Sequence, residues 1–557
     1  MTKYFSFILF VFVSLLMACS SFKKIPQPKE DNLKIDLGVL AADSLGGREA
    51  GSIFEIKARD FIVSEFKNIG LLPFFGNSFY QVFDFKDGAN FNSSSITING
   101  KSFLPNSSFY PLSKSKNDSI SAKIVKVGYG IMSSKPSHND YLNHAILDGK
   151  IFIMEVSVPG GMANYSSFSE YADIDKKIEL ATKFGAKAVI FVNNDSSFND
   201  PRKLISNKNG KTSIPIIFAK DDLQTYLNSI DEAEVTLKVE IQKIDKQAYN
   251  IAGFIDNGSA KNIVIGAHYD HLGLGGETSR CNCGPAIHNG ADDNASGVAS
   301  IMEIARELKS KPLKYNILFI AFSGEEKGLL GSSALMNSKI LNKENVLCML
   351  NFDMVGRMDS LTNELYIYGT ASANEWDSIL PKGNSKLKIS KNPYGIAGSD
   401  QMSFYLDSIP VLFFFTGIHD DYHKPSDDAN KINYDGLSKI INYSLQLINS
   451  IDSLKSISFH AANIKSGESK NYRSGPTLGI VPDYGSAEDG LIVKAVVDDK
   501  PGSKAGILKG DIITKIGEKD VKDIYDYMDA LKECKLDTKC NILVKRNGKI
   551  MQLIVNF

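Results

Sequence analysis

Five clusters of polar residues in the middle of the chain combine side chains that bind metal ions. The clusters are HYDHLG from His268, HNGADDNASG from His288, SGEEKG around Glu325, NFD ending at Asp353, and the segment from His419 to His423. Imidazole and carboxylate groups are ligands that zinc accepts, and its catalytic sites keep one position open for water. A single cluster of this kind is usually a helix cap or a solvated surface, but five in one region predict a metal site.

The elements around these clusters indicate how they are brought together. The apolar runs NIVIGA, YNILFIAF, VLCMLNF and IPVLFFF come directly before four of the clusters, and the fifth cluster opens a helical pattern. Continuous apolar runs separated by helical patterns are typical of buried strands in a largely parallel α/β sheet. Ligands bind beyond the carboxyl ends of strands in such sheets. We therefore expect the clusters to meet at one edge of a sheet.

Length and composition describe a multidomain globular protein. A chain of 557 residues is too long for a single hydrophobic core and suggests about three or four domains. Apolar residues make up 43% and charged residues 23%, with a formal net charge of −1. Because no global positive field exists, we expect no nucleic-acid partner.

The N-terminus has the pattern of an export signal. Lys3 precedes an apolar run from Phe5 to Leu16, which is shorter than the roughly 20 residues that span a membrane. The following LMAC, ending at Cys19, resembles the lipobox of bacterial lipoproteins. That resemblance implies a signal peptide over 1–18, a lipid on Cys19, a tether over 19–32 and a place in the bacterial cell envelope, facing the periplasm or the cell surface. The alternative is plain secretion.

The other cysteines do not form a dense disulfide framework. Cys281 and Cys283 lie in the loop between two of the metal-ligand clusters, where they favour a loop staple or free thiols over metal binding. Cys534 and Cys540 are close enough in sequence to pair, which stays open, and Cys348 lies within an apolar strand as a small core residue.

The segments HYDH, GADDNASG, SGEE, NFDMVGR and DYHKPSD resemble the family of co-catalytic di-zinc exopeptidases. This family includes secreted bacterial aminopeptidases and the glutamate carboxypeptidases, and the segments stand in the family's order. The resemblance implies an α/β fold with a mixed, mostly parallel sheet flanked by helices, and two zinc ions per chain. Its catalytic domain would be discontinuous, over 33–115 and 246–455.

The same resemblance assigns the metal ligands. It implies that His268 and Asp353 hold one zinc, that Glu326 and His423 hold the other, and that Asp293 bridges the two. Two metal ions about 3.5–4 Å apart need one short shared ligand, and a carboxylate with two oxygens supplies it. The resemblance favours Asp293 over Asp292, because the family's ligand directly precedes the NASG-like turn.

Further roles follow from the resemblance, beside these five ligands. Glu325 is the candidate general base, Asp270 the carboxylate that orients His268, and Tyr422 a candidate for stabilising the oxyanion. The remaining polar residues of the clusters match no family ligand. We expect a capping or orienting role for Asp292, surface or loop-packing roles for His271, His288 and His419, and structural support near the substrate cleft from Ser399 and Asp400.

Two further domains are indicated outside the catalytic one. Over 116–245, the order of the strand GKIFIM, a helix, AKAVIFV and SIPIIFA resembles a protease-associated domain, which usually carries no catalytic groups. A polar linker over 456–475 leads to 476–557, whose short strands and Gly-rich turns resemble a PDZ domain. Such domains bind peptide ends by strand addition, or serve as docked modules without a free ligand. The carboxylate-binding loop would consist of Thr477, Leu478, Gly479 and Ile480.

The leading functional interpretation is an exported metallo-aminopeptidase that hydrolyses peptides at the N-terminus. A carboxypeptidase or dipeptidase on the same fold is the first alternative, because one sequence does not locate the group that binds a free amine or carboxylate. Glutaminyl cyclases share the fold but use one zinc. Receptor-like relatives of the transferrin-receptor type have lost the ligands, whereas Glu325 and all five ligands are present here.

Overall fold

The computed structural model describes residues 29–461 and 478–557, except for residues 113, 143, 162–167, 199, 202–211, 277, 282, 384–385, 396–397, 483–489, 497–499, 522–523, 535–537 and 547. The predicted signal peptide, Cys19 and Thr477 lie outside the described residues. Backbone contacts divide the chain into two compact units, Met1–Gln81 with Tyr249–Ala462, and Val82–Ala248 with Asn463–Phe557. No helix in the described part of the chain is both long and apolar enough to cross a membrane.

The main lobe (described residues 29–81 and 249–461) is built on one mixed sheet of order β1-β13-β15-β14-β16-β19-β17-β18, with β2 also paired to β13. Its strands are β1 (Leu72–Pro73), β2 (Tyr80–Asn90), β13 (Gln242–Ile255), β14 (Asn262–His268), β15 (Asn316–Phe322), β16 (Val346–Phe352), β17 (Glu364–Tyr368), β18 (Lys388–Lys391) and β19 (Val411–Phe415). The central strands β15, β14, β16 and β19 run parallel, as the apolar runs predict. Every residue of β15 and β16 is buried, because helices cover both faces of the sheet.

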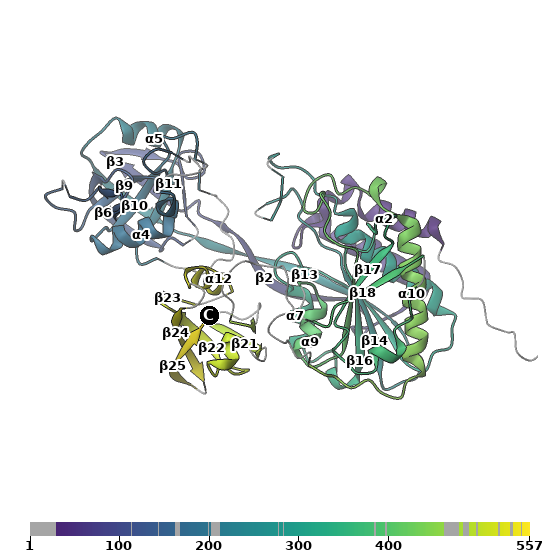
Figure 1. Ribbon diagram of the computed structural model, residues 1–557. Coiled ribbons are helices and arrows are strands. Elements are labelled where there is room, and N and C mark those ends of the chain that lie inside the picture. The colour runs from purple at the N-terminus through teal and green to yellow at the C-terminus, as the bar shows by residue number, and fades with distance from the viewer. Residues whose placement is uncertain are drawn as a thin grey trace, which may run out of the picture. The chain divides into compact units, whose positions relative to one another are not determined.

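The helices of the main lobe lie on both faces of this sheet, with α2 and α10 on one side and α7 and α9 on the other (Figure 1). The lobe contains α2 (Glu30–Leu40), η1 (Asp43–Arg48), α3 (Ile53–Ile69), η3 (Ala291–Ser296), α6 (Gly297–Lys309), α7 (Leu330–Asn337), η4 (Lys343–Asn345), α8 (Trp376–Ile379), α9 (Gln401–Leu406), η5 (Ala429–Lys431) and α10 (Tyr434–Ser453). In α3, the Ser52 hydroxyl accepts hydrogen bonds from the first turn and Gly70 ends the helix with φ of 85°. Both are the sequence signals of a helix start and stop.

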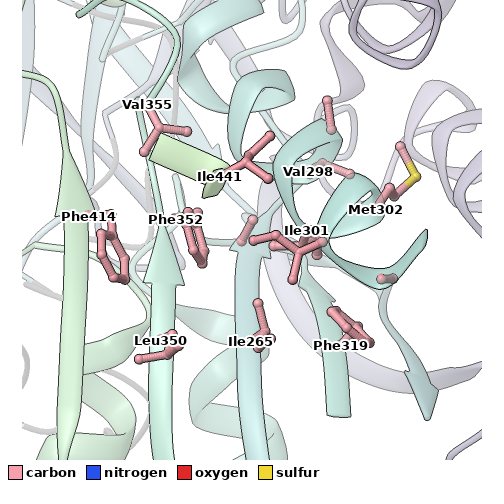
Figure 2. Close-up of a cluster of buried hydrophobic side chains, with 14 of the residues drawn as sticks. Ile265, Val298, Ile301, Met302, Phe319, Leu350, Phe352, Val355, Phe414 and Ile441 are labelled. Carbon is pink, nitrogen blue, oxygen red and sulfur yellow. The ribbon is translucent and has the colours of Figure 1, made fainter. Parts of the chain in front are cut away.

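The core between the sheet and α6 fixes the position of that helix. Figure 2 shows Ile265, Phe319 and Leu350 of three strands facing Val298, Ile301 and Met302 of α6, with Ile441 of α10 nearby. The rings of Phe352 and Phe414, which are paired residues of the neighbouring strands β16 and β19, stack with centroids 4.7 Å apart. Because α6 continues directly from η3, this packing also sets the place of the polar residues in η3.

The inserted domain (82–248) has its own sheet of order β4-β3-β12-β6-β9-β10-β11-β5. Its strands are β3 (Ser95–Ile98), β4 (Lys101–Phe103), β5 (Phe109–Pro111), β6 (Asp118–Lys126), β9 (Ile151–Glu155), β10 (Ala188–Val192), β11 (Ile216–Ala219) and β12 (Glu234–Val239), beside the hairpin β7 (Met132–Ser134) and β8 (Ser137–Asn139). Strands β6, β9, β10 and β11 are parallel. The helices are η2 (Ser169–Ala172), α4 (Ile174–Lys183) and α5 (Asp221–Asn228).

The predicted start of the inserted domain is corrected by its sheet. The sequence places 33–115 in the catalytic domain, but β3 and β4 pair with β12, and β5 pairs with β11. The apolar residues of these strands, such as Ile96 and Phe109, pack in the same core as Ile151 and Ile190. An alternating pattern identifies a strand but not the sheet that the strand joins, so the first segment of the main lobe ends near Gln81.

The C-terminal domain (described residues 478–557) forms a small sheet of order β20-β21-β22-β24-β25, with β23 paired to β22. Its elements are β20 (Ile480–Pro482), β21 (Leu491–Val496), α11 (Pro501–Lys504), β22 (Ile512–Ile516), β23 (Lys519–Asp520), α12 (Ile524–Glu533), β24 (Lys539–Arg546) and β25 (Lys549–Asn556). Buried Asp511 forms a two-pronged ion pair with Arg546, at 2.6 and 2.7 Å. The thiols of Cys534 and Cys540 lie 3.0 Å apart without a disulfide.

The predicted tether over 19–32 and the predicted linker over 456–475 each include residues that belong to the main lobe. Helix α2 begins at Glu30, within the predicted tether, because the Lys29 N–H and the Asn32 amide donate to the Glu303 carboxylate of α6 at 2.8 and 3.2 Å. At the other end, the predicted linker begins at 456, but the His460 N–H still donates to the Ser372 carbonyl at 2.8 Å.

Candidate metal centre

The predicted clusters meet at the carboxyl edge of the parallel strands. His268 is the last residue of β14, and Asp353 follows β16 directly. Glu325 and Glu326 lie in the turn after β15, and His423 lies in the loop after β19. Because the four strands are parallel neighbours, these side chains share one edge.

Asp293 lies at the centre of the site, with its two carboxylate oxygens directed to different pairs of residues. Oδ1 of Asp293 is 3.3 Å from His268 Nε2, which is also 3.3 Å from Asp353 Oδ1. Oδ2 of Asp293 is 3.3 Å from His423 Nε2, which is also 3.3 Å from Glu326 Oε2. The structure thus brings all five predicted ligands together, in two groups that share one carboxylate.

These separations fit metal ions better than hydrogen bonds. Two ligand atoms about 2.0–2.1 Å from a zinc ion, at a tetrahedral angle, are about 3.3–3.4 Å apart. The four separations of 3.3 Å have this length, whereas charge-assisted hydrogen bonds are about 2.7–2.9 Å long. Buried Nε2 of His268 also makes no hydrogen bond. The donor set of imidazole and carboxylate groups therefore fits two neighbouring divalent ions.

His271 belongs to the site, although the sequence predicts a surface or loop-packing role for it. The residue is buried, and its Nδ1 donates to Glu326 Oε1 at 2.7 Å while lying 3.9 Å from Asp293 Oδ2. A group of His271, Asp293 and Glu326 could hold a metal ion by proximity. The distance of 2.7 Å leaves no room for an ion between the two atoms, so His271 orients Glu326 by a hydrogen bond. Its spacing of three residues after His268 is the only sequence signal.

Several groups hold the Asp293 backbone in place. The Asp427 carboxylate accepts hydrogen bonds from the N–H groups of Asp292 and Asp293, at 2.9 and 3.1 Å. The Asp292 carboxylate accepts from the Gly356 N–H at 2.6 Å and lies 3.2 Å from His419 Nε2. Asp292 therefore orients the loop, as predicted, and His419 packs against it. Asp427 is a contributor that sequence reasoning missed, although it lies in a motif that the sequence singles out.

Asp270 connects the imidazole of His268 to Glu325. The Nδ1 of His268 donates to the backbone carbonyl of Asp270 at 3.1 Å, and the Asp270 carboxylate is farther away at 3.7 Å. The same carboxylate accepts from the Glu325 N–H at 3.1 Å. Backbone and side chain of Asp270 thus divide the orienting role that the sequence gives to the carboxylate alone, and Nε2 of His268 is left to face the centre.

Tyr422 lies beside the second group of ligands. Its ring packs against the His423 ring with centroids 3.9 Å apart, and the Arg280 guanidinium lies 4.5 Å from the Tyr422 ring centroid. The Arg280 N–H donates to the His423 carbonyl at 2.9 Å, and His423 Nδ1 donates to the Thr278 carbonyl at 2.9 Å. This loop also contains the disulfide between Cys281 and Cys283, which confirms a loop staple.

Charges in the site shift the pKa values in opposite directions. Burial would lower the pKa of His423, but the Asp293 and Glu326 carboxylates outweigh it and raise that pKa to about 11. Burial and Asp293 would raise the pKa of Glu326, but His271 and His423 lower it to about 2. Burial raises the pKa of Glu325 well above its ordinary value, against the attraction of His268. Carboxylates outnumber imidazoles here, and a cation is the group that balances such an excess.

The remaining predicted residues take supporting places. His288 is buried and bonds the Ser279 hydroxyl and the Ala286 carbonyl, each at 2.8 Å, which is loop packing. Ser399 accepts from the Asn351 amide at 2.8 Å, and burial raises the pKa of Asp400 to about 7. Cys348 is buried in β16, as expected. In the C-terminal domain, Leu478 is buried, Gly479 has φ of 68° and Ile480 begins β20.

Comparisons with known proteins find aminopeptidases among the similar sequences. Aminopeptidase YwaD of Bacillus subtilis (strain 168) is 29% identical over 282 residues, which cover 47% of this chain and 57% of that protein. An aminopeptidase of Pseudomonas aeruginosa (strain UCBPP-PA14) is 27% identical over 260 residues, covering 44% of this chain and 43% of that protein. The chain thus spans about half the length of these relatives. Among solved structures, BSAP, a zinc aminopeptidase from Bacillus subtilis, is 24% identical with a TM-score of 0.47, covering 78% of this chain and 100% of that one.

Profiles of two families match separate parts of the chain. Peptidase family M28 matches residues 250–448, which include every proposed metal ligand, and the PDZ domain matches residues 476–557. The chain therefore contains a Peptidase family M28 domain followed by a PDZ domain.

Proposed function

We propose that the protein is a metallo-aminopeptidase that removes N-terminal residues from peptides with a centre of two zinc ions. One observation carries the proposal. The two oxygens of Asp293 face separate imidazole–carboxylate pairs, each at 3.3 Å. A single-metal site needs no such shared ligand, whereas two ions about 3.5–4 Å apart do. The names of the relatives, which are aminopeptidases, support this choice over the carboxypeptidase alternative.

Zinc fits the donor set, since imidazole and carboxylate are among its usual ligands. His268 and Asp353 would hold one ion, His423 and Glu326 the other, and Asp293 both. When bound, the ions activate water and polarise the scissile carbonyl. Hydrogen bonds from the Nδ1 atoms of His268 and His423 to the carbonyls of Asp270 and Thr278 keep both Nε2 atoms directed at the centre.

Glu325 is the proposed general base. Its N–H is fixed by Asp270, and its carboxylate interacts with His268 and Asp353. A buried carboxylate with a raised pKa takes a proton from water and returns it to the leaving amine near neutral pH. Tyr422, whose ring packs against His423, would donate a hydrogen bond from its phenolic O–H to the oxygen of the attacked carbonyl.

The proposal extends to the parts outside the M28 domain. Cys19 would carry a lipid that anchors the protein to the bacterial cell envelope, either facing the periplasm or on the cell surface. The PDZ domain would bind a peptide or protein C-terminus at the loop of Leu478, Gly479 and Ile480. Removing residues after 475 would leave turnover of dipeptide anilides unchanged and reduce turnover of long peptides if this domain recruits substrate.

The decisive experiment measures the activity and metal content of the soluble chain after Cys19. Wild type, Glu325→Gln and the control Glu344→Gln, an exposed residue of η4, are assayed on aminoacyl-anilides and on N-blocked peptides. We expect hydrolysis of free-amine substrates only, two zinc ions per chain, and a loss of about 10²–10⁴-fold in kcat for Glu325→Gln with full metal content. Activity confined to N-blocked substrates with a free carboxylate would establish a carboxypeptidase, and absence of both metal and turnover would leave a binding protein.

A further inference from the structure

Arg48 is a buried cation in the main lobe that none of the proposed catalytic steps uses. Its guanidinium is surrounded by backbone carbonyls, and the residue is 1% exposed. Nε donates to the Tyr269 carbonyl at 2.7 Å, Nη1 to the Asn289 carbonyl at 2.6 Å, and Nη2 to the Gly290 carbonyl at 3.0 Å. A fourth bond joins Nη1 to the Leu40 carbonyl at the end of α2. Four of its five N–H groups are therefore engaged.

Three of the four carbonyls that Arg48 binds belong to the two segments that contain His268 and Asp293. Tyr269 stands between His268 and Asp270 in the chain, and Gly290 precedes Asp293 by three residues. The rigid, planar guanidinium fixes the distance and the angle between its acceptors, which a lysine amine does not. One side chain thus connects the segment that carries His268 to the segment that carries Asp293.

The backbone around Arg48 is fitted closely between the same segments. Gly46, Gly47 and Arg48 all have positive φ, at 48°, 71° and 50°. A Cβ on Gly47 would lie 2.5 Å from the Gly273 carbonyl oxygen and 2.6 Å from that of His288. Only glycine fits at this point. The Gly273 N–H also donates to the Gly47 carbonyl at 3.0 Å. The backbone of the turn therefore packs closely against Gly273 and His288, in addition to the four hydrogen bonds of the Arg48 side chain.

The charge of Arg48 and its hydrogen bonds would act on a bound cation in opposite directions. The guanidinium interacts with the carboxylates of Asp270, Asp293, Glu326 and Asp427, and burial lowers its pKa only to about 10, so it is charged at neutral pH. A positive charge near the site opposes the binding of a metal ion. The hydrogen bonds favour binding, because they hold the ligands in place before the ion arrives. Substitution of Arg48 separates the two effects, because loss of the charge would strengthen zinc binding and loss of the hydrogen bonds would weaken it.

We propose that Arg48 is a positioning residue of the metal centre, holding residues 268–270 and 289–293 at the separation that lets His268 and Asp293 face the same ion. The inference rests on the proposed two-metal function. It assigns a role to the turn η1 (Asp43–Arg48), which lies far from the M28-matched segment in sequence. Loss of this positioning weakens metal binding even though the repulsive charge is removed with it.

The test compares Arg48→Met and Arg48→Lys with a matched control, Arg306→Met. Arg306 of α6 is another arginine of the main lobe, and it bonds carboxylates of Asp36 in α2 and Glu65 in α3 at 2.6 and 2.8 Å. Each apo-protein is first checked by circular dichroism and thermal unfolding. The dissociation constant of zinc is then measured by competition with a chromophoric chelator, well below every unfolding temperature.

We expect both Arg48 variants to bind zinc about 10–100-fold more weakly than wild type, as other losses of ligand-orienting groups do. Arg306→Met should unfold at a lower temperature and keep the zinc affinity of wild type. Unchanged or tighter binding by Arg48→Met would overturn the proposal, because that result means that charge dominates. If Arg48→Met does not fold, Arg48→Lys decides alone, since it keeps the positive charge and loses the planar arrangement of guanidinium donors. Absence of zinc from wild type itself would instead overturn the proposed function.

Discussion

The main lobe and the inserted domain both contain a cation that is buried against backbone carbonyls, Arg48 and Lys177, and the two cases differ in what surrounds the cation. In the inserted domain, Lys177 of α4 donates to the carbonyls of Glu155, Val156 and Ser157 at 2.8, 3.2 and 2.6 Å, where β9 ends. In the main lobe, Arg48 donates to carbonyls beside the metal ligands. Both cations thus brace the carboxyl end of a parallel sheet.

The polar groups near Lys177 satisfy one another. The Glu155 carboxylate accepts hydrogen bonds from both the backbone N–H and the side-chain amide of Asn194. The Asn193 amide donates to Asp200 at 2.8 Å. Among the residues that the structure describes, every buried side-chain nitrogen or oxygen without a hydrogen-bond partner lies in the main lobe, including His268 Nε2 and Asp270 Oδ2.

This difference shows that the carboxyl edge of a parallel sheet does not by itself make a metal site. Both sheets present polar residues there, but in the described part of the chain only the main lobe has buried polar atoms without hydrogen-bond partners, together with groups of side chains that could hold a metal ion. Unpaired buried polar groups cost free energy, which a stable protein retains where a ligand compensates for it. The chemistry therefore belongs to the unpaired groups and not to the topology.

The largest effect is expected from Asp293→Ala, which removes the shared carboxylate. Each half of the centre then keeps only two protein ligands, fewer than the three that catalytic zinc sites use. We expect fewer than two zinc ions per chain and a loss of at least about 10³-fold in kcat/KM, as for removal of a group essential to the transition state. Metal analysis of the dialysed protein and hydrolysis of an aminoacyl-anilide measure the two quantities.

The neighbouring residue gives a matched control for this prediction. Asp292→Asn keeps an oxygen that can accept from the Gly356 N–H and changes no proposed ligand. It should keep two zinc ions per chain with a small decrease in stability. If Asp292→Asn loses metal and Asp293→Ala does not, the assignment of the bridge is wrong.

A smaller effect is expected from His271→Ala, which removes the hydrogen bond to Glu326 at 2.7 Å. Loss of a group that orients a metal ligand costs about 10–100-fold in metal affinity. At saturating zinc the variant should still hold two ions, which separates it from Asp293→Ala. His288→Gln is the control, since His288 bonds only loop groups. Loss of an ion from His271→Ala at saturating zinc would make His271 a ligand.

Local signals predict the strands of the lobe, and the resemblance to the di-zinc exopeptidases predicts its ligands. The runs that become β14, β15, β16 and β19 are continuous and apolar, and His268, Glu326, Asp353 and His423 lie at or beyond the ends of these strands. The choice of Asp293 over Asp292 also rests on that resemblance, because the family's ligand directly precedes the turn that opens α6. The strands themselves are determined by their own neighbours in the chain, so the sequence carries their signal directly.

Residues that act across long separations have no such signal. Arg48 meets carbonyls more than 200 positions away, and Asp427 meets the N–H groups of Asp292 and Asp293. The strand β3 is recognisable by its alternation, yet its pairing with β12, like that of β5 with β11, depends on the tertiary fold. The role of His271 depends on one distance to Glu326, which spacing alone does not determine.

Lys177→Met tests the other side of the comparison. The substitution leaves three buried carbonyls without a donor, so we expect the inserted domain to lose roughly 2–4 kcal/mol of stability. Zinc affinity and kcat should not change, because the described hydrogen bonds of the Lys177 amine go to carbonyls of the inserted domain itself. The single tryptophan, Trp376, is buried in the main lobe, so its fluorescence follows that lobe while circular dichroism follows both. A shift in the fluorescence transition would show that the cations of the two units are coupled.

The smallest expected effect is a pH dependence that only the lysine can show. Burial lowers the pKa of Lys177 to about 8, whereas an unfolded lysine titrates near about 10.4. Between these values the folded domain binds fewer protons than the unfolded chain, so its free energy of unfolding rises with pH, and Lys177→Met lacks this rise. Arg48 keeps its proton up to about pH 10. Denaturant unfolding of wild type and Lys177→Met is therefore measured from pH 7 to 9.5. The free energies of unfolding of the two proteins should diverge with pH when followed by circular dichroism and change in parallel when followed by Trp376 fluorescence. Parallel changes with both probes would mean that the Lys177 amine stays protonated in the folded domain and is as permanent a charge as Arg48.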